Sequence, residues 1–275
     1  MTEPTIRAYS WNPRRGLPGP GLWRLRWGPR TRNFGDLLGP DIVERMRARS
    51  GLSERSRDGK PHTLFTVGSV LHFAQDDDVI WGTGVNGKME PAAHAWTRLD
   101  IRAVRGPLTR RWLREQRGLE VPEIYGDPAL LLFELGYPRP ERSSRHNVSF
   151  LPNLNDRATP LPREQQISPR RPLNEVVARI AASDHLVTSS LHGLVLAELI
   201  GVPVALLRPA AETMFKYEDY VRGTGRTDVA VFDDFDVALR HATRPGADRD
   251  EPLAEWSPRP LMDAFPVDIF TPAAP

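Results

Sequence analysis

The sequence contains no cysteine, which excludes disulfide bonds, thiolate nucleophiles and zinc or iron–sulfur sites held by cysteine. Lysine is almost as scarce, because it stands only at positions 60, 88 and 216, and the other 34 of the 37 basic residues are arginines. The net charge of +2 gives no case for a nucleic-acid-binding protein. In a chain with so few lysines, each one is a candidate for a specific role.

Long apolar runs are also missing, so no segment is predicted to cross a bilayer. The first residues, MTEPTIRAYSW, lack the charged start and apolar stretch of a signal peptide, and we therefore expect a cytoplasmic protein. The length of 275 residues, of which 40% are hydrophobic and 26% charged, suits a soluble globular chain of two domains.

Short apolar strands alternate with helical segments along the chain, a pattern typical of an α/β fold with a mostly parallel sheet. In the first half we expect strands at residues 6–11, 63–68, 78–82, 101–105 and 123–127. Helices are expected there from Asp36 onward, after a turn at Gly35, and at 69–74, 106–118 and 128–136. In the second half, strands are expected at 148–153, 185–189, 202–207 and 229–234, and helices at 173–183, 190–201 and 235–243. Residues 50–60 read as a polar connector, and the final TPAAP as a frayed end.

The polar stretch YPRPERSSRHN at residues 137–147 separates the two sets of elements and predicts a domain boundary. We predict two Rossmann-like doubly wound domains, residues 1–140 and 141–275, that face each other across a central cleft. Ligands of such folds bind beyond the carboxyl ends of the strands.

A histidine, His192, opens the apolar stretch SLHGLVLAELIG. The strand before it ends at Ser189, and the helix is apolar on nearly all faces, so His192 falls in the first turn of a buried helix. A helix N-terminus attracts anions, and a histidine there can donate a hydrogen bond or deliver a proton. The alternative is a histidine held by a neighbouring loop carbonyl, and the local pattern favours neither.

Three other charged residues stand near strand ends or turns. Asp36 follows a turn at Gly35 and is either a helix N-cap or a carboxylate that accepts a proton from a hydroxyl. Arg105 ends a buried apolar run, where an unpaired charge is costly, so its partner is either an anionic ligand or a structural acid. Lys216 follows a predicted strand by a short loop and is either exposed or a phosphate-binding cation.

Two segments carry weaker signals. WGTGVNG at residues 81–87 contains G-x-G-x-x-G after a strand, but Pro91 interrupts the helix that a dinucleotide-binding site needs. We interpret it as a turn at the cleft, with a dinucleotide-dependent oxidoreductase as the alternative. Residues 11–32 contain six arginines and three tryptophans and form either a solvated loop or a contact with an anionic membrane surface or lipid-linked acceptor. The spacing of the other histidines suggests no metal site.

Seven pieces occur in a fixed order: NFGDLLGPDI (33–42), VGSVL (67–71), VIWGTG (79–84), VRGPLTRRWL (104–113), GDPALLL (126–132), TSSLHGLVLAELIGVPV (188–204) and FKYEDY (215–220). Together they resemble the polysaccharide pyruvyltransferase family, above all the bacterial exopolysaccharide ketal-pyruvate transferases. The resemblance implies a fold like the two-domain GT-B glycosyltransferases and phosphoenolpyruvate as donor. The pyruvyl group would move onto two hydroxyls of one sugar as a cyclic ketal, with release of phosphate and without a metal or redox cofactor. The acceptor would be a saccharide, free or carried on a lipid at the inner face of the membrane.

The resemblance places the residues for donor binding and catalysis at Asp36, Arg105, His192 and Lys216. Arg105 would grip one anionic group of the donor and Lys216 would neutralise the other. His192 would protonate the methylene carbon of the donor, and Asp36 would take the proton of the sugar hydroxyl.

One position departs from the family pattern. Many members have arginine two residues before the histidine, in an R-L-H-G motif, where this chain has Ser190. Either another group supplies that donor contact, with Arg208 as the candidate, or the donor lies slightly differently. This departure leaves a non-catalytic anion-binding homologue as an alternative. A GT-B-type sugar-nucleotide glycosyltransferase is another, because the same two-domain architecture hosts both functions.

Overall fold

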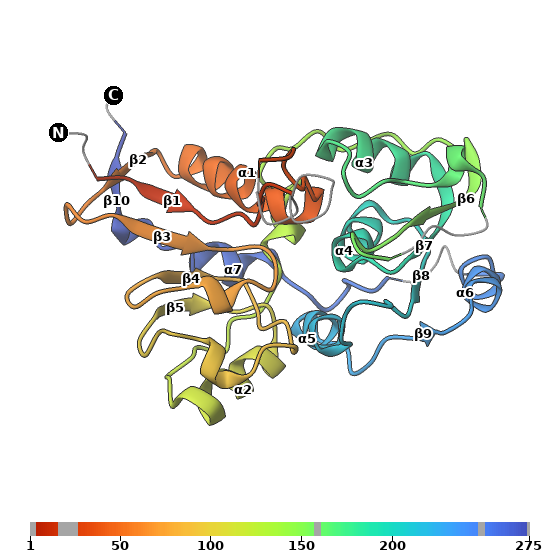
Figure 1. Cartoon of the computed structure of the whole chain (residues 1–275). Helices are drawn as coiled ribbons and strands as arrows, with labels where there is room; N and C mark the ends of the chain where they lie inside the picture. Colours follow the sequence, from red (N-terminus) through yellow and green to blue (C-terminus); the bar gives the residue numbers. More distant parts are fainter. Residues whose placement is uncertain (1–3, 16–26, 157–160, 247–250, 274–275) are drawn as a thin grey trace.

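The computed structural model describes residues 4–15, 27–156, 161–246 and 251–273, and these residues form two four-stranded parallel sheets and one two-stranded antiparallel sheet. The first parallel sheet consists of β1 (Ile6–Ala8), β3 (His62–Phe65), β4 (Val79–Trp81) and β5 (Asp100–Ala103). The second consists of β6 (His146–Leu151), β7 (Ser183–Thr188), β8 (Val204–Leu207) and β9 (Val231–Phe232). Figure 1 shows the first sheet on the left and the second on the right. The predicted α/β class with parallel sheets is confirmed.

Seven helices accompany these strands in the described residues. They are α1 (Phe34–Arg49), α2 (Pro107–Arg117), α3 (Leu173–Ala181), α4 (Leu191–Ile200), α5 (Phe215–Gly223), α6 (Phe235–Ala242) and α7 (Pro258–Asp263). Short 3₁₀ turns occur at η2 (Leu71–Phe73), η3 (Pro91–Ala93), η4 (Pro128–Leu131), η5 (Arg163–Gln165) and η7 (Val267–Ile269).

Both faces of each parallel sheet are buried, because successive residues of a strand point to opposite sides. In β3, Leu64 belongs to the core that contains α1, whereas Phe65 belongs to a second core that contains Leu113 of α2. In β7, Leu186 packs on the side of α3 and α4, and Val187 packs against α6. This explains why the strands read as continuous apolar runs and not as alternating ones.

The strands of each sheet follow one another in chain order: β1–β3–β4–β5 and β6–β7–β8–β9. A doubly wound sheet reverses its strand order at a switch point, and no such reversal occurs among the described strands. The Rossmann-like doubly wound arrangement of each half therefore stays a prediction.

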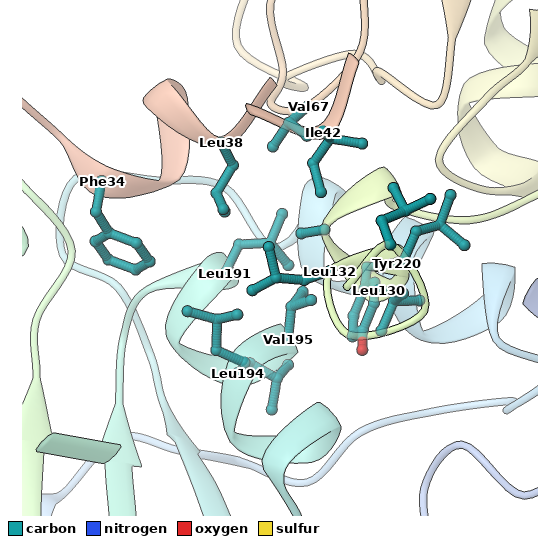
Figure 2. Packing of buried hydrophobic residues seen from close by; sticks show 14 of the residues in the cluster. Phe34, Leu38, Ile42, Val67, Leu130, Leu132, Leu191, Leu194, Val195 and Tyr220 are labelled. Atoms are coloured by element: carbon teal, nitrogen blue, oxygen red, sulfur yellow. The ribbon is translucent and has the colours of Figure 1, made fainter. Parts of the chain in front are cut away.

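One apolar core continues from the first half of the chain into the second. Helix α4 lies at its centre, and all its residues from Leu191 to Glu198 are buried, as the sequence predicted. Figure 2 shows side chains of this core from α1, the η4 region, α4 and α5 packed together: Phe34, Leu38, Ile42, Leu130, Leu132, Leu191, Leu194, Val195 and Tyr220. Because these elements share one core, the start of α1 and the start of α4 have fixed positions relative to each other.

The end of the chain returns to the first half of the molecule. Strand β10 (Phe270–Pro272) pairs antiparallel with β2 (Leu52–Ser56), and Trp81 donates a hydrogen bond to the carbonyl of Leu261 in α7 at 2.8 Å. The predictions of a polar connector at residues 50–60 and of a frayed end up to Pro272 are wrong, because each strand is stabilised by a partner far away in the sequence. The division into residues 1–140 and 141–275 stays a prediction.

Three local expectations also differ. Residues 123–127 make a single bridge, between Val104 and Tyr125, in place of a strand. The helix predicted at 128–136 is the short turn η4, whose first residue is Pro128. Helix α1 begins at Phe34, two residues before the start expected at Asp36, and Pro40 lies inside it.

Candidate functional site

A cavity of about 370 Å³ is lined by residues from both halves of the chain. Much of its wall follows the carboxyl ends of parallel strands in both sheets, where α/β folds bind ligands. The first half contributes Trp11, Asn33, Asp36, Gly68, Ser69, Val70, His72, Phe73, Asn86 and Lys88, and the second contributes Asn153, Leu154, Asn155, Ser190, Leu191, His192, Glu212 and Lys216. Four of the six predicted site residues therefore share one wall: Asp36, Ser190, His192 and Lys216.

His192 lies in the first turn of α4, as predicted, and its imidazole packs against the start of α1. Its ring meets Phe34 edge-on, with ring centroids 6.4 Å apart. A Cβ atom at Gly35 would lie only 2.1 Å from Nδ1 of His192, so position 35 must be glycine for the ring to fit. The opposite nitrogen, Nε2, lies 3.5 Å from the carboxylate of Asp127. The expected alternative, a histidine held by a loop carbonyl, is not what the structure shows.

Asp36 lies in the first turn of α1 and is not its N-cap. The N-cap is Asn33, whose side-chain amide donates a hydrogen bond to Asp36 at 2.7 Å. Burial raises the pKa of Asp36 above its ordinary value, and the hydrogen bond from Asn33 and the nearby His192 and Lys216 lower it only in part. A carboxylate with a raised pKa is a stronger base than an exposed one. The predicted turn at Gly35 is wrong, since Gly35 is helical and close packing explains it.

Lys216 lies at the start of α5, a helix that the sequence analysis did not predict. It forms an ion pair with Glu212 at 3.2 Å, and the other oxygen of Glu212 lies 2.9 Å from Nζ of Lys88. Burial lowers the pKa of Lys216 below that of an ordinary lysine, while Glu212 opposes this shift. Two of the three lysines in the sequence therefore line the cavity, one from each half, with a glutamate between them.

Arg105 does not line the cavity, because its side chain is completely buried behind the wall. Its guanidinium donates to Asp219 at 3.0 Å, to the carbonyl of Val85 at 2.8 Å and to Ser69 at 2.5 Å. The sequence left two possible partners for Arg105, an anionic ligand and a structural acid. The structure shows the acid, which is Asp219. Only Ser69, among these partners, reaches the cavity.

The two remaining candidates have different positions. Ser190 is the N-cap of α4, and its hydroxyl oxygen accepts a hydrogen bond from the backbone of Gly193 at 3.3 Å. It lines the cavity, at the position where the family resemblance implied an arginine. Arg208 is half-exposed, pairs with Asp233 and is not part of the cavity wall. The structure therefore does not bring Arg208 to the place of the missing arginine.

The glycine-rich loop at residues 82–87 is a turn beside the cavity, as predicted. The backbone is left-handed at Gly82 and Gly87, and Asn86 lines the cavity. A dinucleotide-binding loop leads directly into a helix, whereas residues 83–90 contain no helix. This removes the main support for the oxidoreductase alternative.

The predicted membrane-contact segment, residues 11–32, is described only at its two ends. These ends run alongside each other, with hydrogen bonds of 3.0 Å between the backbones of Arg15 and Pro29 and of 2.9 Å between those of Thr31 and Pro13. Trp11 lines the cavity and Trp27 is exposed. Trp23, Arg24 and Arg26 lie outside the described residues. Membrane contact stays a prediction.

Sequence reasoning did not single out four residues that belong to this site or adjoin it: His72, Lys88, Asp127 and Glu212. Lys88 was marked only by the scarcity of lysine, and Glu212 by its spacing of four residues from Lys216. Asp127 occurs in the quoted piece GDPALLL but has no local pattern that points to a histidine 65 residues later. In the described ranges, no three His, Asp or Glu side chains come together as metal ligands would, and no helix is long and apolar enough to cross a membrane.

Comparison with known proteins adds two findings. The family described as "Polysaccharide pyruvyl transferase" matches residues 56–209, a span that includes His192 but neither Asp36 nor Lys216. The chain is also 27% identical over 217 residues to the succinoglycan biosynthesis protein ExoV of Rhizobium meliloti (strain 1021). The similar region covers 73% of this chain and 64% of that protein, so the chain spans less than two thirds of the relative's length.

Proposed function

The chain belongs to the polysaccharide pyruvyl transferase family, and on this premise we propose that it transfers the pyruvyl group of phosphoenolpyruvate to a sugar of a cell-surface or exopolysaccharide precursor. The product is a cyclic pyruvate ketal, and phosphate is released. The observation that carries this proposal is that Asp36, His192 and Lys216, from three separate helices, line one cavity. We further propose that the two halves have the GT-B arrangement and that the protein works in the cytoplasm, at the inner face of the membrane.

The donor is a small anion with a carboxylate and a phosphate, and the cavity offers it several positive groups. Lys88 and Lys216 supply two cations, and the N-terminus of α4 supplies backbone N–H groups next to His192. Glu212 forms ion pairs with both lysines in the structure. The proposal therefore requires the anionic donor to replace Glu212 as the partner of at least one lysine.

The reaction proceeds in two additions at the same carbon of the donor. His192 gives a proton to the methylene carbon, which becomes a methyl group, and the adjacent carbon becomes open to attack. A sugar hydroxyl bonds to that carbon while Asp36 takes its proton. The second hydroxyl then displaces phosphate, which leaves with the second hydroxyl's proton, and the ketal ring closes. Burial raises the pKa of Asp36, which makes it better suited to take a hydroxyl proton.

The uncharged part of the cavity wall suits a saccharide acceptor. Asn86 lies 3.4 Å from the ring of His72, and His72 in turn packs against Phe73 with ring centroids 4.0 Å apart. Phe73 is 43% exposed and offers an apolar face to the cavity. Amide side chains that bond hydroxyls beside an aromatic face are a suitable surface for a sugar ring. The acceptor is proposed to lie here, free or linked to a lipid.

Arg105 takes an indirect part in this proposal. It connects Asp219 of α5 to Ser69 in the cavity wall, so it positions α5, which carries Lys216, relative to the first half. This replaces the direct grip on the donor that the family resemblance implied.

The test is incubation of the protein with ¹³C-labelled phosphoenolpyruvate and a panel of saccharide acceptors. We expect release of phosphate together with a ketal carbon signal on the acceptor. His192→Gln should lower turnover by about 10²–10⁴-fold in a folded protein. Near-normal turnover in that variant would refute the role of His192. Turnover of a nucleotide sugar, with none of phosphoenolpyruvate, would instead identify a glycosyltransferase, and donor binding without phosphate release would identify a non-catalytic homologue.

A further inference from the structure

Two buried polar atoms behind the cavity wall have no hydrogen-bond partner among the described residues, and they face each other. They are Oδ2 of Asp127 and Nε2 of His192, 3.5 Å apart. The other carboxylate oxygen of Asp127 accepts a hydrogen bond from the backbone of Ala129 at 3.0 Å, as the N-cap of η4. Buried polar atoms are costly unless they are paired. One oxygen of Asp127 is thus fixed by its own turn, and the other is free to hold the histidine.

The two residues come from different halves of the chain, and each is held in place by packing. Asp127 is completely buried at the start of η4, and the His192 side chain is only 8% exposed. Contacts between η4 and α4 are part of the common core, so the distance between the two side chains is set by the fold. The opposite ring nitrogen, Nδ1, lies beside Gly35 at the start of α1, where Asp36 lines the cavity.

We propose that Asp127 is a positioning residue that fixes the tautomer of His192 and thereby makes Nδ1 the nitrogen that delivers the proton to the donor. This inference rests on the proposed function, because the proton needs a donor molecule in the cavity. Asp127 accepts the hydrogen of Nε2 throughout. When His192 is an imidazolium, the Nδ1–H bond breaks as the new C–H bond forms at the methylene carbon, and the neutral ring keeps its hydrogen on Nε2.

Charged groups face His192 from three elements. Asp127 faces it from η4 and Asp36 from α1, and both carboxylates favour the charged imidazolium. Lys216, from the start of α5, opposes that charge, and Glu212 beside Lys216 reduces its effect. Loss of the carboxylate at position 127 therefore removes one of the two groups that stabilise the protonated ring.

The first test is the variant Asp127→Asn. Its amide oxygen can still cap η4, while its NH₂ group must donate to Nε2, so the neutral ring must carry its hydrogen on Nδ1. ¹⁵N NMR of the histidine rings, assigned with His192→Gln, should show the Nε2–H tautomer in the wild type and the Nδ1–H tautomer in Asp127→Asn. The same tautomer in both proteins would overturn the proposal. This measurement needs neither donor nor acceptor, so it remains informative even if the chain does not transfer pyruvyl groups.

The second test is kinetic and uses a matched control. In Asp127→Asn, kcat should fall by at least ~10-fold, but less than the ~10²–10⁴-fold expected for His192→Gln. The alkaline limb of kcat/KM should move to lower pH, and the donor Kd should change little. The control is Glu198→Gln, which neutralises a buried carboxylate of α4 that is bound by Tyr220 and Arg226 outside the cavity. Asp127→Asn could instead lose kcat while its pH profile stays the same as those of the wild type and Glu198→Gln. That result would mean that Asp127 has only a structural role, and it would overturn the proposal.

Discussion

Two of the places where charged side chains join the two halves of the chain are built in opposite ways. Around Arg105 and Asp219 both side chains are completely buried, and the guanidinium has three separate partners. In the cavity, Asp36 and Lys216 have pKa values shifted toward their neutral forms. Beside it, Asp127 and His192 each have a buried polar atom without a hydrogen bond from any described residue. A fully paired site holds two parts of a protein together, whereas incompletely paired and titratable groups are typical of sites that bind or react.

If the Arg105 site is structural, its disruption should have a large effect on stability. Arg105→Ala leaves Asp219 as an unpaired buried charge, and we expect the free energy of unfolding to fall by about 3–5 kcal/mol, measured by urea denaturation. The double variant Arg105→Met with Asp219→Leu should lose less than Arg105→Ala, since no buried charge remains. If the free energy of unfolding fell by less than ~1 kcal/mol in Arg105→Ala, Arg105 would not be a residue that stabilises the fold.

Asp36→Asn should separate activity from stability in the cavity. Turnover should fall by about 10²–10⁴-fold, because the base for the hydroxyl proton is gone. Stability should not fall: the pKa of Asp36 is raised in the folded state, so ionised Asp36 destabilises the fold as pH rises through that pKa, and asparagine removes this penalty. Thermal denaturation at pH 5 and pH 7 is the check, and a lower unfolding temperature in the variant at pH 7 would contradict this view.

The pH dependence of donor binding should report on Lys216. Because the pKa of Lys216 is lowered, its positive charge is lost at a lower pH than that of an ordinary lysine, and donor binding should weaken as pH rises through that range. Lys216→Arg keeps its charge, so its donor Kd should vary less with pH than that of the wild type between pH 7.5 and 9, where the charge of the donor phosphate is constant (its second pKa is about 6). Calorimetry across that interval compares the two proteins, and parallel pH curves would exclude Lys216 as the titrating group.

Glu212→Gln should have a smaller effect, in the opposite direction. It removes the negative charge that competes with the donor for Lys88 and Lys216. We expect the donor Kd at pH 7 to fall several-fold, roughly 1 kcal/mol in binding free energy. Weaker donor binding in this variant would show that Glu212 orients the lysines and does not compete with the donor.

The smallest effect is expected at Arg208. It is half-exposed, pairs with an exposed Asp233 and does not reach the cavity. Arg208→Ala should change stability by less than about 0.5 kcal/mol and leave donor Kd unaltered. A clear loss of donor affinity would mean that Arg208 replaces the family arginine after all.

The sequence was a good guide to features that depend on local pattern. The strand before His192 and the buried helix α4 were predicted from apolar runs, and the position of His192 at a helix start followed from them. Lysine scarcity drew attention to Lys216, and a second lysine, Lys88, lines the same cavity.

The features that the sequence did not reveal all depend on partners that are distant along the chain. Pairing of β2 with β10 joins segments about 200 residues apart, so neither reads as a strand alone. The partner of Arg105, Asp219, lies 114 residues away on a helix that was missed. Gly35 was predicted to be a turn residue. The structure shows that glycine is needed there because the ring of His192 leaves no room for a side chain, and the local sequence does not reveal that contact.

The measurement we would make first is calorimetric titration of phosphoenolpyruvate into the wild type, Lys216→Met and Lys60→Met. Lys60 is an exposed lysine between β2 and β3, so it is a control for the same substitution outside the cavity. We predict micromolar-to-millimolar binding by the wild type and by Lys60→Met, and no measurable binding by folded Lys216→Met. Equal binding by all three proteins would contradict the assignment of this cavity as the donor site.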